Sequence, residues 1–238
     1  MTAAQPAARR TGPQGGPPLL APALAYGALV IASVALSART PQPDASAASV
    51  LAYVRSHHTF MQVAGCLEFA AAVPLAIWTA TGYRRLRTLG VSAPGAVIGL
   101  SGGLLAAASL ALSGLISWTV SQVSATVDAG LARVLADLSF ATGAAGFVAP
   151  LGLLLAGMAV PALILRLLPR WLAWTGLVVA AIAELSTFSL LTGALDVTLP
   201  VGRFGGLLWL VAVSVLLPRS RHDLRPAAAG PARVRAAS

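Results

Sequence analysis

Residues 95–120 read GAVIGLSGGLLAAASLALSGLISWTV and contain no charged side chain. They belong to a longer uncharged interval that runs from Arg87 to Asp128. Since a bilayer core of about 30 Å is crossed by roughly 20 apolar residues in a helix, this stretch is long enough to span a membrane. It predicts an integral membrane protein.

The composition of the whole chain agrees with this prediction. Of 238 residues, 57% are hydrophobic and 10% are charged, and the mean hydropathy is +0.82. Soluble domains have about 25% charged and about 45–50% apolar residues. This balance excludes a disordered chain and an ordinary soluble enzyme, and the single cysteine, Cys66, excludes a disulfide scaffold. The net charge of +9 is spread in small groups between apolar blocks, so no nucleic-acid partner is expected.

Uncharged intervals on both sides of residues 95–120 mark five more apolar segments, which predicts an all-α bundle of six transmembrane helices over residues 19–218. The six ranges are 19–38, 60–82, 95–120, 134–165, 171–192 and 200–217. Residues 1–18 and 219–238 are predicted as disordered tails, because neither can bury much apolar surface. In an alternative, the first segment is a cleaved signal peptide and five helices remain.

The arginines predict the orientation of the bundle, because Arg supplies all 16 basic residues. With the N-terminus inside, four of them lie outside or near the outer surface, and the other twelve are cytoplasmic. The four are Arg39, Arg55, Arg133 and Arg203. An excess of cytoplasmic arginine places both termini in the cytoplasm. The wealth of Arg, Ala, Gly and Pro is typical of an actinobacterial type of bacterium, so we expect the plasma membrane.

The Arg-rich tail at 219–238 is a candidate contact for anionic lipid, with a pure topology signal as the alternative. At the opposite side, residues 45–58 predict a short helix with Asp44 or Ser46 as its N-cap. This helix either lies in the outer interface or extends the segment 60–82 outward.

Two histidines, His57 and His58, lie at the outer mouth of the segment 60–82. They could form a pH sensor or half of a metal site, but the sequence offers no His or Cys cluster that would complete such a site. An exposed interfacial pair is the favoured interpretation, and no metal or cofactor is expected.

Small residues repeat every four positions along residues 95–120 in two stripes. Gly95, Gly99 and Gly103 form the first, which is a helix-packing face or a contact for a second copy or another membrane protein. The second stripe consists of four serines, Ser109, Ser113, Ser117 and Ser121. Their hydroxyls either bond back to carbonyls of the preceding turn or line a polar cavity.

Ionisable side chains inside spanning helices are costly and mark candidate functional sites. Glu68, Glu184 and Arg203 fall in three different segments, and the rise of a helix places the two glutamates roughly 10–12 Å from the outer surface. Ser109 and Ser113 fall at a similar depth. We therefore predict a polar cluster of these five residues in the outer half of the bundle. The alternative is a structural ion pair between Arg203 and one of the glutamates.

Asp137 has a simpler interpretation. It follows Arg133 by four residues and falls in the first turn of the predicted segment 134–165, where an acid suits the helix dipole. A structural role is therefore expected for it.

Enzyme motifs give little support for catalysis. Gly99-Leu100-Ser101-Gly102 resembles the GxSG motif of rhomboid intramembrane proteases, which need a histidine on a later helix. The three histidines of this chain, at 57, 58 and 222, lie elsewhere. No CxxC, HExxH or P-loop motif is present. The sequence favours a non-enzymatic protein, with no catalytic residue.

Three stretches carry a family resemblance: residues 53–68, residues 83–87 (YRRLR) and residues 168–172 (LPRWL). In these, the chain resembles uncharacterised six-helix bacterial membrane proteins that are grouped as domains of unknown function. The resemblance implies a fold and a membrane location but no activity.

From the residues themselves, we expect a component that binds or passes a small solute or a proton through the polar cluster. A membrane assembly protein with a purely structural ion pair is one alternative, and a membrane-embedded enzyme is another.

Overall fold

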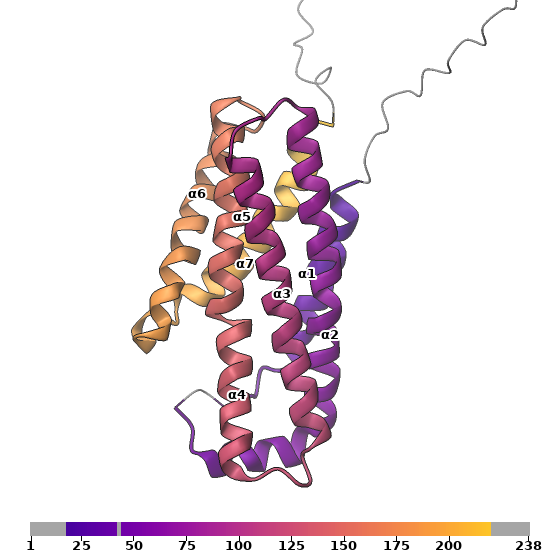
Figure 1. The fold of residues 1–238 in the computed structure, drawn as a ribbon, viewed down its shortest axis with the longest axis vertical. Helices are drawn as coiled ribbons and strands as arrows, with labels where there is room; N and C mark the ends of the chain where they lie inside the picture. The colour runs from indigo at the N-terminus through magenta and orange to yellow at the C-terminus, as the bar shows by residue number, and fades with distance from the viewer. Residues whose placement is uncertain (1–17, 42–43, 220–238) are drawn as a thin grey trace, which may run out of the picture.

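The computed structural model describes residues 18–41 and 44–219, and within these ranges the chain forms helices and turns without any strand (Figure 1). The elements are α1 (Leu20–Leu36), α2 (Ala47–Thr88), α3 (Gly95–Gln122), α4 (Ala129–Gly143), α5 (Ala145–Ile164), α6 (Arg170–Leu185), η1 (Ser186–Leu190), η2 (Gly193–Leu195) and α7 (Thr198–Leu216). The predicted tails lie outside the described residues, except for Pro18 and Arg219.

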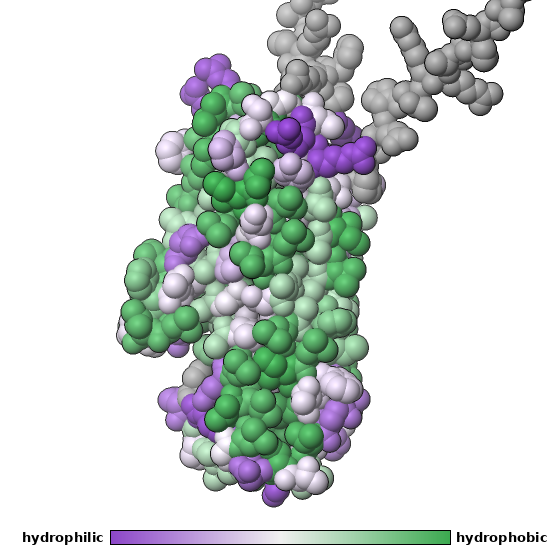
Figure 2. Space-filling model, viewed as in Figure 1, coloured by the Kyte–Doolittle hydropathy of each residue, from purple (hydrophilic) through white to green (hydrophobic). Residues whose placement is uncertain are grey.

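Five helical stretches of the described chain are long and apolar enough to cross a membrane. They are Ala47–Thr88, Gly95–Gln122, Ala129–Ile164, Arg170–Leu190 and Gly193–Leu216. Leu20–Leu36 is a shorter apolar helix of 17 residues. Hydrophobic residues cover most of the visible face, and hydrophilic ones gather mainly near the two ends (Figure 2). The all-α prediction is thus confirmed for the described residues, with five helical stretches long and apolar enough to cross a membrane and one shorter apolar helix instead of six full spans.

The structure selects one of the two alternatives left open for residues 45–58, which extend the segment 60–82 outward, and it corrects one predicted boundary. The short helix expected at 45–58 and the segment 60–82 form one helix, α2, which is kinked at His57 (φ −124°, ψ 20°). Ser46 caps it, because its Oγ accepts a hydrogen bond of 3.2 Å from the backbone N–H of Ser49. The segment 134–165 is not one helix: it begins at Ala129 and breaks at Ala144, between α4 and α5.

Helix α3 packs against α2, α4 and α5 and lies at the centre of the arrangement (Figure 1). It meets α2 where two glycines face each other: a Cβ on Gly114 would lie 2.6 Å from the carbonyl oxygen of Gly65. Contacts shorter than 3.0 Å are not tolerated without a shift, so the two backbones touch here.

The predicted glycine stripe of α3 faces α5 and α2 of the same chain. A Cβ on Gly95 would lie 3.2 Å from the carbonyl oxygen of Gly157, Gly99 lies against the same turn of α5, and Gly103 lies against Thr79 of α2. Gly99 and Gly103 are buried. The packing function of the stripe is therefore fulfilled within the chain, which leaves these two glycines inaccessible to a second copy or another protein.

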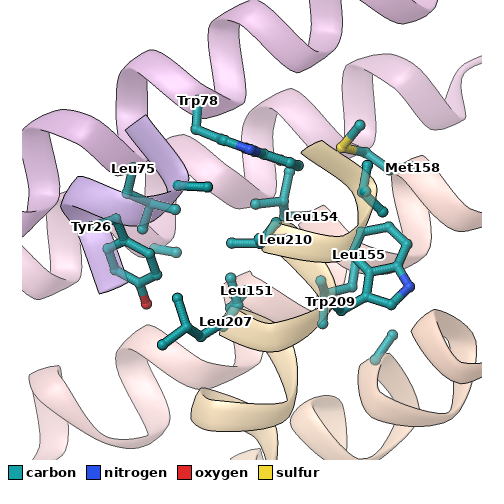
Figure 3. Close-up of a cluster of buried hydrophobic side chains, with 14 of the residues drawn as sticks. Tyr26, Leu75, Trp78, Leu151, Leu154, Leu155, Met158, Leu207, Trp209 and Leu210 are labelled. Carbon is teal, nitrogen blue, oxygen red and sulfur yellow. The ribbon is translucent and has the colours of Figure 1, made fainter. Parts of the chain in front are cut away.

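A buried apolar cluster joins α1, α2, α5 and α7 in the middle of the bundle (Figure 3). Two tryptophans add directed bonds to it. The indole N–H of Trp78 donates to Ser214 Oγ at 2.7 Å, and that of Trp209 donates to the carbonyl of Leu172 at 2.8 Å. Because α7 takes part in both bonds, these side chains fix α7 against α2 and α6.

We expect the substitution Gly114→Ala to destabilise the protein by about 1–3 kcal/mol, because the methyl group meets backbone atoms of α2 that cannot move aside independently. The measurement is thermal unfolding in detergent. Gly130→Ala is the matched control, since Gly130 is exposed in the first turn of α4 and an added Cβ would meet only a side-chain atom, Asp128 Oδ1 at 3.3 Å, and no backbone of another helix. Equal melting temperatures of the two variants would contradict this packing.

Candidate functional site

The break between α4 and α5 is the centre of the candidate site. Ala144 has φ −92° and ψ −99°, which is not helical, and it serves as the last residue of one helix and the first of the next. Its N–H bonds back to Phe140 O, while its carbonyl accepts from the N–H groups of Phe147 and Val148. The carbonyl of Gly143 is therefore released from the regular pattern of the helix.

The local sequence explains why the helix breaks at this point. Gly143 and Gly146 flank the break, and both residues lower the cost of leaving helical geometry. Pro150 lies inside α5, where its missing N–H leaves the carbonyl of Gly146 without a regular helical partner and weakens the turn that follows the break. These three residues were the available signal for the break, which hydrophobicity alone does not reveal.

Arg203 of α7 supplies the partner for the released carbonyl. Its guanidinium group donates a hydrogen bond to Gly143 O, and its Cζ lies 5.1 Å from the centroid of the Phe147 ring. A side chain on a helix tilts toward the N-terminal end, and for α7 this is the end nearest the break. One arginine thus binds the end of α4 and stacks on the first turn of α5.

Glu68 of α2 faces the same break from another side. A Cβ added to Gly143 would lie 3.1 Å from Glu68 Oε1 and even closer to the hydroxyl of Ser113. The absence of a side chain at Gly143 therefore leaves room for a carboxylate and a hydroxyl beside the end of α4. Glu68 and Ser113 each lie roughly 27–30 Å along their helices from the end of the bundle where α2 ends and α3 begins.

The two opposite charges come together without pairing. Arg203 and Glu68 are close enough to interact electrostatically. Among the described residues, however, the only ion pair within 4.0 Å joins Arg133 and Asp137. The structural ion pair considered for Arg203 is therefore absent from the described residues. The group that Arg203 bonds directly is the backbone carbonyl of Gly143.

The serines of α3 bond across to α4. Ser113 Oγ donates to the carbonyl of Ser139 at 3.0 Å, and the hydroxyls of Ser117 and Ser139 lie 2.7 Å apart. Only Ser121 bonds back within its own helix, to Trp118 O at 2.6 Å. Two of the four serines therefore line the interface that leads to the break.

Tyr26 of α1 adds a hydroxyl that the sequence did not single out. Its side chain is only 1% exposed, and its hydroxyl has no hydrogen-bond partner among the described residues. It lies within electrostatic range of both Arg203 and Glu68. Figure 3 shows its ring beside Leu75, with the hydroxyl turned toward Leu207. A buried, unpartnered hydroxyl is uncommon, and this one belongs to the buried apolar cluster that borders the site.

The structure brings together three of the five residues in the predicted cluster: Glu68, Arg203 and Ser113. Ser109 lies one turn away, with its Oγ 3.9 Å from a Cβ added to Gly146. Glu184 lies apart from them: it is exposed on α6, where its Oε1 would lie 3.1 Å from a Cβ on Gly152.

The secondary candidates lie farther along the bundle. Asp137 forms an ion pair of 2.8 Å with Arg133, and both side chains are partly exposed. The helix dipole does not explain this position, because α4 begins at Ala129 and Asp128 is its N-cap. His57 is stacked on Tyr53 at 4.5 Å between ring centroids, and His58 is exposed.

The fold and the site together define a polytopic α-helical membrane protein with a polar site at a broken helix. No protein-family model, curated protein or solved structure matches the chain. The resemblance to six-helix bacterial membrane proteins stays a prediction, and the chemistry of the site is the only guide to its role.

A double-mutant cycle of Glu68→Gln and Arg203→Gln separates the two roles of the charges. We expect Arg203→Gln to destabilise the protein by about 1–3 kcal/mol, because it removes a charged donor from the Gly143 carbonyl. We expect Glu68→Gln to cost less, and the coupling between the two to stay below about 1 kcal/mol.

The measurement is unfolding in detergent, with Glu184→Gln as the control carboxylate outside the site. A coupling energy of about 3 kcal/mol or more would instead reveal a buried ion pair between Glu68 and Arg203.

Proposed function

We propose that the protein binds or passes a small polar solute or a proton at the break between α4 and α5. One observation carries this proposal: Glu68 and Arg203 face the interrupted helix with opposite charges and do not pair. If the only task were to hold helices together, direct pairing of the two charges would lower their cost in a membrane.

The broken backbone supports a binding role. Irregular backbone within a membrane is tolerated only where it is covered by protein or lines a water-filled cavity. In secondary transporters, discontinuous helices place the ends of half-helices at the substrate site. Here the carbonyl end of α4 and the amide end of α5 meet at Ala144, and the dipole of α5 favours negative charge there.

The side chains around the break offer groups for both signs of charge. The carboxylate of Glu68 would hold a cationic group or a proton, and the guanidinium of Arg203 would hold an anionic one. Ser113, Ser139 and Tyr26 would add hydroxyls, which donate or accept as the solute requires. A small solute with separated polar groups fits this set better than an apolar one.

The orientation that we propose rests on the described arginines. At the end of the bundle where α2, α5 and α7 end lie Arg84, Arg85, Arg87, Arg166, Arg170 and Arg219. The other end of the bundle carries residues of both positive and negative charge, such as Arg133 and Asp128. By the positive-inside rule, the first end is cytoplasmic, as are both termini of the chain. The candidate site then belongs to the outer half of a bacterial plasma membrane.

Assembly with another membrane protein is a second candidate role, favoured by Glu184. This carboxylate is exposed on α6, within a hollow lined by Ala181, Leu185, Thr187 and Phe188. A carboxylate that faces lipid is costly, whereas one that faces a polar group of a partner helix is not.

We expect Glu68→Gln to abolish passage in reconstituted vesicles, while Glu184→Gln retains the wild-type rate. Proton entry is followed with a pH-sensitive dye under a potassium diffusion potential, and entry of glycine or glycerol is followed by light scattering. Both variants remove one carboxylate from a spanning helix, so only the position differs. If wild type and Glu68→Gln give equal rates with every probe, the proposed passage is wrong.

The orientation is tested by cysteine labelling of intact cells in a Cys66→Ser background. We expect Thr126→Cys, in the connection between α3 and α4, to react with a membrane-impermeant maleimide. Thr88→Cys, at the end of α2, should react only after permeabilisation. The reverse pattern would invert the bundle and move the site to the cytoplasmic half.

A further inference from the structure

A second polar site lies at the opposite end of the bundle from the break. There the start of α1 and the ends of α2 and α7 enclose a pocket of about 140 Å³. Arg85, Arg219 and Ser214 supply its polar lining, and Leu19 and Val215 supply apolar walls. The pocket shares no residue with the candidate site, so it is independent of the proposed function.

The two arginines make this pocket strongly basic. Arg85 is only 8% exposed, which is unusual for a guanidinium group. Arg219 lies close enough for the two positive charges to repel each other. No Asp or Glu belongs to the described lining. Burial of a guanidinium group such as that of Arg85 is costly, and an anion bound in the pocket would relieve that cost.

The size and walls of the pocket narrow the class of anion. A cavity of roughly 10–15 Å³ already holds one water molecule, so a pocket of about 140 Å³ has room for a group larger than water. This suits a phosphate with its four oxygens, which guanidinium groups bind through paired hydrogen bonds. Val215 is 64% exposed and Leu19 is buried, so the pocket lies next to apolar surface on which an acyl chain can rest.

We propose that this pocket binds the phosphate of an anionic phospholipid headgroup. Arg85 holds the phosphate from the α2 side, and Arg219 approaches it from the end of α7. Basic pockets between helices at the cytoplasmic side are known to bind such headgroups. The bound lipid joins the start of α1 to α2 and α7, which complements the Trp78 to Ser214 hydrogen bond nearby.

The test is thermal unfolding of the full chain in detergent, titrated with phosphatidylglycerol, phosphatidylcholine or inorganic phosphate. We expect phosphatidylglycerol to raise the melting temperature, with little effect of the other two. The apparent affinity for phosphatidylglycerol should fall about tenfold or more in Arg85→Gln and in Arg219→Gln. Arg84→Gln is the matched control, because Arg84 is the exposed neighbour of Arg85 on the same helix.

Arg219 lies beyond the end of α7, so its substitution keeps the test valid even if Arg85→Gln fails to fold. An equal loss of affinity in Arg84→Gln would overturn the site in favour of general surface attraction. If inorganic phosphate raised the melting temperature as much as phosphatidylglycerol does, an anionic lipid would not be the ligand of this pocket. The same conclusion would follow if phosphatidylcholine raised the melting temperature equally.

Discussion

The backbone of α3 touches the backbones of α2 and α5, and the positions of the other helices depend on these contacts. Gly114 faces Gly65 on one side, and Gly95 and Gly99 face Gly157 on the other. Lipid tails are as apolar as leucine, so association of helices in a membrane depends on close packing rather than on the hydrophobic effect. Each glycine gives up side-chain packing so that two helices can approach, and α3 does this on both faces.

The same close packing brings the polar groups together. Because α3 lies directly against α2, Glu68 and Ser113 occupy the same level and both border Gly143. Because α5 also lies against α3, the broken helix is held beside them, and Arg203 needs only to reach across from α7. The charged groups are thus positioned by glycine contacts elsewhere, and no direct ion pair between them is needed.

The sequence predicted the helices better than their contacts. Long uncharged intervals identify apolar helices, and the repeat of Gly95, Gly99 and Gly103 identifies a packing face, because both are local patterns. The facing residues Gly65 and Gly157 stand in other helices and show no pattern of their own. Counting residues placed Glu68 and Glu184 at a similar depth, but Glu184 lies apart from Glu68 and Arg203 because depth does not determine which way a side chain faces. Tyr26 gave no signal, since its proximity to Arg203 and Glu68 becomes visible only in three dimensions.

The break at Ala144 joins structure to function in one further way. A continuous helix over residues 129–164 would satisfy its own carbonyls, and Arg203 would then be a half-buried cation without a backbone partner. The break and the arginine therefore depend on each other: the released carbonyl of Gly143 stabilises the guanidinium, and the guanidinium satisfies the carbonyl. Glu68 borders the same glycine and interacts with Ser113 and, at longer range, with Arg203, but among the described residues it forms no ion pair within 4.0 Å. The proposed binding role accounts for a carboxylate that is kept in a spanning helix without a direct ion pair.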